Sequence, residues 1–74
     1  MVENLIKDLR AIINKKIDAH DLDKMIADFD RNVESIEDNL FRINILKNGQ
    51  KVLAIDYDAN IFNETVVVKK INEW

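Results

Sequence analysis

The sequence contains no cysteine and no proline, and it has a single glycine among its 74 residues. Without cysteine the chain can form neither disulfides nor thiolate zinc sites. One glycine cannot supply the glycine-rich loop that cradles a nucleotide phosphate. No apolar run approaches the ~18 residues of a transmembrane helix, and the polar, acidic N-terminus lacks a signal-peptide pattern. We therefore expect a cytoplasmic protein without a resident cofactor.

Groups for nucleophilic catalysis are almost as scarce. The chain has one serine, one threonine and one histidine, which are Ser35, Thr65 and His20. We place Ser35 on a helix and Thr65 on a strand, so the sequence gives no nucleophile paired with a base. Carboxylates are plentiful, but a domain of this size offers no deep cleft in which their pKa values would separate. The sequence therefore predicts a protein that is not an enzyme.

Three short stretches resemble metal sites, and each has a simpler interpretation. Residues 18–23 hold His20 among aspartates, but carboxylates are favoured in the first turn of any helix, and a zinc site draws its ligands from separate elements. Residues 28–32 and 56–60 both begin with the Asp-x-Asp-x-Asn of a calcium loop. Both lack the glycine and the bidentate glutamate that such a loop needs later on. We expect no metal site.

The residues that are present favour a folded chain of mild negative charge. Hydrophobic residues make up 47% of the chain and charged residues 34%, which is a globular composition. Residues 1–74 have room for one domain, and its small core would gain from a second subunit. We therefore expect a homodimer, with an efficiently packed monomer as the alternative. The net charge of −3 disfavours direct binding of nucleic acid or of an anionic membrane.

The hydrophobic spacing is helical in the first half of the chain. Apolar residues recur at intervals of three and four, which predicts helices over residues 2–14 and 19–39. Asn14 tolerates the left-handed conformation that ends a helix, and Asp18 is suited to cap the start of the next one. Because no glycine or proline interrupts this part, one bent helix over residues 2–39 is the alternative.

The second half alternates apolar and polar residues, which is the period of a strand. We predict strands over residues 40–47, 50–57 and 62–71 in an antiparallel meander, with both helices packed on one face. The fold class is therefore α+β.

The hairpin between the first two strands is marked by Asn48-Gly49. A two-residue loop would pair Ile45 with Val52 and Ile43 with Ala54, and so would leave Leu53 and Ile55 on the opposite face. A three-residue loop over residues 47–49 puts Ile43 and Ile45 on the face of Leu53 and Ile55, so we predict the longer loop. The other face would then carry Leu46, Val52, Ala54 and some of the consecutive valines, and we expect the dimer contact there.

Acidic residues are concentrated in the predicted second helix. Residues 18–38 hold eight acidic side chains and two basic ones. Five of the acidic residues share one sector of a helical wheel: Asp23, Asp30, Glu34, Glu37 and Asp38. Like charges four residues apart destabilise a helix by ~0.2–0.5 kcal/mol a pair, so this row is a candidate for partner binding. The simpler alternative is a solvated face that keeps the protein soluble.

Two functions follow from these patterns. The first is a small, non-catalytic protein–protein interaction or regulatory module, acting through its surface as a homodimer. The second is an inhibitor of the phage anti-defence type, whose carboxylate row imitates a phosphate backbone and blocks a basic nucleic-acid-binding groove on another protein. The abundance of isoleucine, asparagine and lysine suits an AT-rich genome, such as that of a bacterium or its phage.

Overall fold

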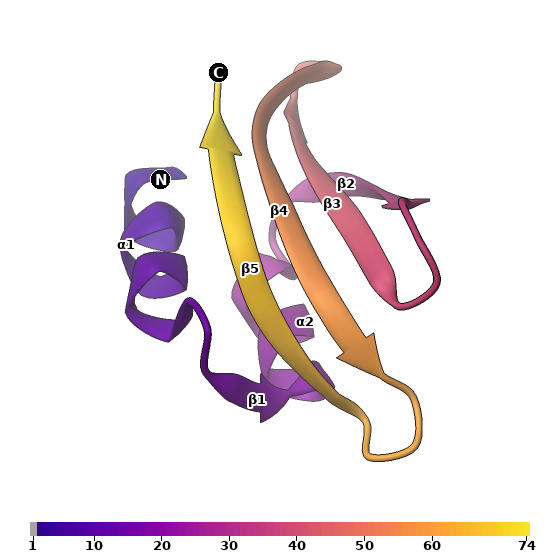
Figure 1. Cartoon of the computed structure of the whole chain (residues 1–74). Helices are drawn as coiled ribbons and strands as arrows, with labels where there is room; N and C mark the ends of the chain where they lie inside the picture. The colour runs from indigo at the N-terminus through magenta and orange to yellow at the C-terminus, as the bar shows by residue number, and fades with distance from the viewer. Residues whose placement is uncertain (1) are drawn as a thin grey trace.

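The computed structural model describes residues 2–74, which form two helices and five strands. In chain order these are α1 (Val2–Ile12), β1 (Lys16–Asp18), α2 (Ala19–Ile26), β2 (Asp30–Ser35), β3 (Leu40–Lys47), β4 (Gln50–Asn60) and β5 (Thr65–Glu73). The strands form one antiparallel sheet in the order β1-β5-β4-β3-β2. In Figure 1, α1 lies beside β5 and α2 lies behind the sheet.

The predicted three-stranded meander under two helices is wrong. Helices of the predicted number are present, but the sheet has five strands, because residues 16–18 and 30–35 pair as its two edge strands. The first is too short to leave a periodic pattern in the sequence. The second was assigned to a helix, which in the structure ends at Ile26 instead of residue 39.

The early end of α2 has a local cause. The Phe29 N–H donates to the Ile26 carbonyl oxygen at 3.0 Å, which closes a tight turn. The Arg31 guanidinium donates to the carbonyl oxygens of Ile26 and Phe29 at 3.3 and 3.2 Å, so these acceptors at the helix end are satisfied. The apolar spacing that continues beyond this turn is not a buried helical stripe, because Val33 is 56% exposed.

The link between the helices follows the predicted chemistry. Asn14 has a φ of 65°, and its N–H donates to the Val68 carbonyl oxygen at 2.8 Å. This residue therefore turns the chain from the end of α1 towards the sheet, as predicted. Asp18 caps α2, because its carboxylate accepts from the His20 N–H at 2.9 Å. The single-helix alternative is excluded by this break.

The hairpin from β3 to β4 keeps the predicted faces by a different route. Its turn has two residues, Asn48 and Gly49, with φ angles of 53° and 79°, and residues 47 and 50 are paired. A bulge then follows, because Ile45 pairs with Leu53 while Leu46 pairs with Lys51. The extra residue restores the pairing that puts the apolar residues of both strands against the helices. The three-residue loop is therefore wrong, although the resulting face is right.

The core lies between the two helices and one face of the sheet. The third predicted strand, placed at residues 62–71, is β5 and lies inside the sheet between β1 and β4. Its Val66 and Val68 are buried in the core, whereas Val67 lies on the other face. The buried cluster consists of Leu5, Leu9, Leu22, Ile26, Ile43, Ile45, Leu53, Ile55, Val66 and Val68. This arrangement leaves β2 at the edge farthest from α1.

Candidate functional site

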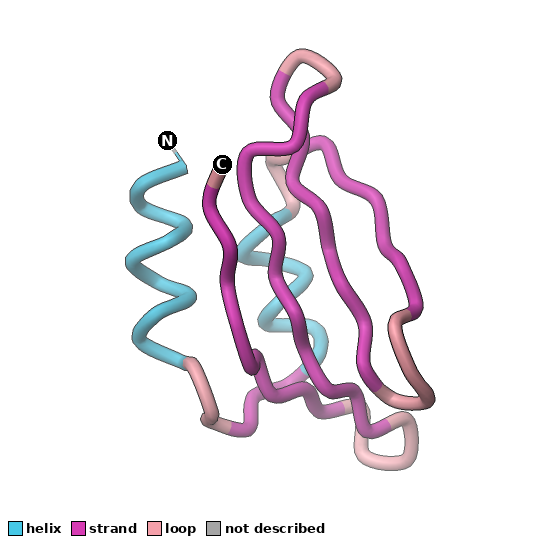
Figure 2. Tube along the Cα trace, turned by 45° about the horizontal axis from the view of Figure 1, so that its top comes forward, coloured by secondary structure: helices cyan, strands magenta, loops and turns pink. Residues whose placement is uncertain are grey.

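The two edges of the sheet differ in length and in protection. β1 forms one edge with three residues and continues directly into α2. β2 forms the other edge with six residues, and all six are exposed to solvent. Figure 2 shows β2 at the right margin of the sheet with no helix or strand beyond it. Because a long exposed edge strand offers its backbone to an incoming strand, β2 is the candidate functional site.

The hairpin that follows β2 shows which backbone groups of the strand are unpaired. The Ile36 N–H donates to the Leu40 carbonyl oxygen at 2.9 Å, one residue beyond the last paired residue of β2. Hydrogen-bonded residues alternate along an antiparallel strand, so the backbone groups of Asn32 and Glu34 point towards β3. The residues whose N–H and C=O groups point away from the sheet are Arg31, Val33 and Ser35.

An apolar strip lies beside these free groups on the helix side of the sheet. Val33 pairs with Ile43 of the core, yet the Val33 side chain is 56% exposed because no helix reaches over it. Phe41 lies diagonally across from Val33 and stacks on Tyr57, with ring centroids 5.7 Å apart. Burial, and secondarily the nearby Asp23 carboxylate, raises the pKa of the Tyr57 hydroxyl above its usual value. An added strand would extend this apolar strip.

The structure does not place the five predicted partner-binding residues in one helical row. Asp23 lies on α2, Asp30 and Glu34 lie on β2, and Glu37 and Asp38 lie in the turn from β2 to β3. The predicted row fails because the helix that would align them ends at Ile26. Four of the five nevertheless lie along β2 and its turn. All five side chains are exposed.

The excess negative charge of the chain is concentrated at this edge. Residues 28–38 carry five carboxylates and one cation, Arg31, whereas the net charge of the whole chain is only −3. Ion pairs within residues 2–74 join Arg10 to Glu73 and Arg42 to Asp56, and neither uses these five carboxylates. The edge is therefore an acidic surface, on which Arg42 of β3 lies opposite Glu34 and is the nearest cation to it. This excess of carboxylates is visible in the composition of the segment.

The sheet face away from the helices carries polar side chains beside the predicted apolar ones. Leu46 and Ala54 lie on this face, because they alternate with the core residues Ile45 and Ile55, and the dimer contact expected there stays a prediction. Arg42 donates from Nε and Nη2 to the two carboxylate oxygens of Asp56, at 2.7 and 3.2 Å, and this pair raises the pKa of Arg42. Asn44 Nδ2 donates to Asn32 Oδ1 at 2.8 Å and to Glu34 Oε2 at 2.6 Å. Val52, expected on this face, packs against the core because of the bulge.

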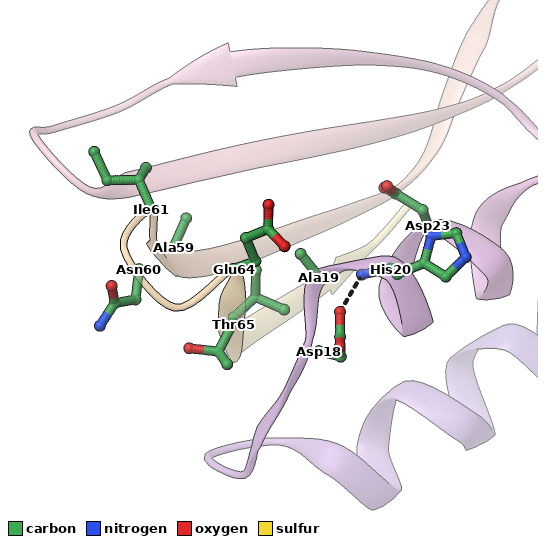
Figure 3. Close-up of a pocket in the computed structure, with 10 residues that line it drawn as sticks. Asp18, Ala19, His20, Asp23, Ala59, Asn60, Ile61, Glu64 and Thr65 are labelled. Atoms are coloured by element: carbon green, nitrogen blue, oxygen red, sulfur yellow. Dashed lines mark hydrogen bonds between the residues drawn. The ribbon is translucent and has the colours of Figure 1, made fainter.

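A hollow of about 440 Å³ lies between the start of α2 and the β4–β5 hairpin. Figure 3 shows Asp18, Asn60 and Glu64 at its wall, with their polar ends pointing in different directions. The Asp18 carboxylate is already used as the helix cap. Residues 2–74 contain no group of three or more histidine or acidic side chains that could hold a metal. The hollow, which His20, Asp23 and Thr65 also line, therefore shows no cluster of metal ligands in this part of the chain.

The hairpin tip next to this hollow exposes two large apolar side chains. Ile61 is 73% exposed and Phe62 is 91% exposed. The Asn60 side chain fixes the tip, because its Oδ1 accepts from the Phe62 and Asn63 N–H groups at 3.0 and 3.3 Å. The sequence predicts a turn at residues 58–60 and a strand from residue 62, and neither pattern indicates an exposed apolar tip.

Neither helix of residues 2–74 combines the length and the apolar composition that crossing a bilayer requires. Comparison of the chain with protein-family models, with curated proteins and with solved structures finds no match.

Proposed function

We propose that the protein is a non-catalytic protein–protein interaction module that binds an extended segment of its partner at the free edge of β2. A strand added to a sheet edge gains affinity from backbone hydrogen bonds, and its alternate side chains supply specificity. The observation that supports this proposal most directly is the outward direction of the backbone groups of Arg31, Val33 and Ser35 on a fully exposed strand. We place this action in the cytoplasm, because the chain lacks cysteine.

The composition of β2 supports binding over simple exposure. Protein edges that must stay unpaired are commonly short, bulged, or blocked by charged side chains (lysine above all) or proline. β2 runs for six residues, pairs with β3 without a register shift, and has neither lysine nor proline, so its charged side chains are its one protection against pairing. Its charges are mainly carboxylates, which repel acidic strands and leave the edge open to others.

A proline at Val33 tests this proposal. Val33→Pro removes a backbone donor from the free edge and leaves the pairing with β3 intact, because the N–H of residue 33 points outward. Val33→Ala is the matched control, since it shortens the side chain and keeps the N–H. Proteins from a lysate of the source cell would be captured on the wild type and on both variants. We expect the specific partner to be retained by the wild type and by Val33→Ala, and lost from Val33→Pro. Equal retention by all three would place the interaction elsewhere.

The nucleic-acid mimic remains a second prediction with less geometric support. Imitation of a phosphate backbone needs an ordered row of carboxylates, and the helix that was expected to align them ends at Ile26. The concentration of carboxylates at the β2 edge still favours a mimic of nucleic acid. Reversal of Glu37 and Asp38 to lysine should abolish binding by a mimic, whereas Val33→Pro should not affect it. This comparison separates the two functions.

A further inference from the structure

We infer that the segment bound at β2 is a basic strand, with lysine or arginine on one face and a β-branched apolar side chain on the other. This inference rests on the proposed function, and it adds the chemistry of the partner. It follows from the side chains that β2 presents on its two faces and from the charge at its two ends.

The face of β2 away from the helices favours cationic side chains on a bound strand. Its side chains there are Asp30, Asn32 and Glu34, and two of the three are carboxylates. Side chains directly opposite on an added strand would lie ~4.5–5.5 Å away between Cβ atoms, close enough for ion pairs. Asp28 before the strand and Glu37 and Asp38 after it extend the negative field beyond both ends.

The other face of β2 favours an apolar side chain at one position of the bound strand. Val33 is its only apolar residue and is 56% exposed, so a β-branched side chain opposite would bury both. Arg31 shares this face, but its guanidinium is held by the carbonyl oxygens of Ile26 and Phe29, at 3.3 and 3.2 Å. Its charge is therefore turned towards the end of α2 and does not oppose a cationic partner strand directly.

A second copy of the chain fits this edge less well. Two copies of β2 related by a twofold axis perpendicular to the sheet would pair in antiparallel fashion, and residues opposite each other would lie on the same face of the sheet. The axis must then pass beside one residue that pairs with its own copy. Centring on Asn32 sets Asp30 opposite Glu34 of the second copy, and centring on Glu34 sets that residue opposite itself. Centring on Val33 sets Asn32 opposite Glu34 and opposes no two carboxylates within the strand. The first two arrangements therefore oppose like charges directly, which is destabilising, and the third still brings together two edges with an excess of carboxylates.

Two synthetic peptides test the inference. One is the capped peptide Thr-Lys-Val-Lys-Val-Lys-Thr, and the other has glutamate in place of every lysine. Affinity is measured by fluorescence anisotropy, and the binding surface is mapped by backbone amide shifts. We expect the basic peptide to bind at β2 about tenfold more tightly than the acidic one, since two cross-strand pairs change from attraction to repulsion. Added salt should weaken the binding, because the charges are exposed.

Matched variants locate the charge effect. Asp30→Asn with Glu34→Gln removes two charges and keeps an acceptor for Asn44, so affinity for the basic peptide should fall roughly fivefold. Asp8→Asn with Asp21→Asn removes the same charge from exposed helix positions and should leave the affinity unchanged. An equal fall in affinity for the two double variants would show that the effect depends on net charge alone, and it would overturn the inference.

The remaining outcomes separate the inference from the proposed function. Equal binding of both peptides at β2 would uphold strand addition and reject the basic partner. If neither peptide perturbs the amides of β2, both the inference and the proposed function are rejected. A free protein that sediments as a dimer, and as a monomer after Val33→Pro, would make a second copy the occupant and overturn the inference.

Discussion

Prolines at two neighbouring positions of β2 should have different effects on the free energy of unfolding. Asn32 pairs with Asn44, and its N–H points towards β3. The N–H of Val33 points to solvent. Proline removes the N–H at either position, and Asn32→Ala and Val33→Ala control for the change of side chain. The difference between proline and alanine at each position therefore isolates the backbone effect.

The expected magnitudes follow from the partners of each backbone group. Asn32→Pro deletes a ladder hydrogen bond worth about 1 kcal/mol. It also leaves a carbonyl without a donor at Asn44, which is only 1% exposed; an unsatisfied buried acceptor costs about 1–3 kcal/mol. Relative to Asn32→Ala, we expect a loss of about 2–3 kcal/mol. Relative to Val33→Ala, Val33→Pro should lose less than about 1 kcal/mol, because no ladder bond is broken and an edge strand tolerates proline there.

Urea denaturation followed by circular dichroism measures these four free energies of unfolding. The slopes of the transitions should agree among the variants, which shows that the same surface is exposed on unfolding. If the Val33→Pro variant folds and the Asn32→Pro variant does not, the result also agrees with the account. Equal losses at the two positions would refute the alternation of free and bonded groups on which the binding site depends.

Three further predictions concern the rest of the fold. Asp56→Ala should lower the free energy of unfolding by about 1–2 kcal/mol in urea denaturation, between the values for exposed and buried pairs, because the side chains of Arg42 and Asp56 are 37% and 12% exposed. Burial, with a smaller contribution from Asp23, raises the pKa of Tyr57, so its neutral form contributes stability that is complete below pH of about 10 and is lost as the pH rises through the folded-state pKa. Above that pH, the melting temperature should therefore fall more steeply with rising pH in the wild type than in Tyr57→Phe. Glu64 has a φ of 55°, so Glu64→Asn should raise the melting temperature, with a gain of about 0.5–1 kcal/mol.

The features that the sequence predicted correctly depend on local chemistry. The left-handed turn at Asn14 and the cap at Asp18 each follow from the residue itself and its nearest neighbours. The shared face of Ile43, Ile45, Leu53 and Ile55 follows from the requirement that apolar residues of paired strands face one core. The bulge at Val52 was missed because two different loops give the same final face, and only the observed pairing separates them.

The error at β2 arose because its sequence matches a helix better than a strand. Val33 is the only β-branched residue in the strand, and the spacing from Phe29 to Leu40 imitates a helical stripe. The helix ends through contacts of Arg31 with carbonyl oxygens, and a sequence pattern does not show such contacts. Residues 37–39, Glu-Asp-Asn, are typical of a turn and were the one available sign of a hairpin before β3.

The acidic residues of the candidate site were visible in the sequence, but their arrangement was not. Asp30 and Glu34 were expected on one helical face and instead share one face of a strand. The free edge itself depends on the strand order β1-β5-β4-β3-β2, which is set by contacts between distant segments. Composition thus predicted the charge of the surface, whereas only the fold revealed the unpaired backbone beside it.

Amide hydrogen exchange along β2 tests the central claim most directly. In the free protein the amides of Val33 and Ser35 should exchange fast, while those of Asn32 and Glu34 should exchange slowly. With a basic strand bound, the two fast amides should become slow. Slow exchange at Val33 and Ser35 in the free protein, or fast exchange at both in the complex, would contradict the account.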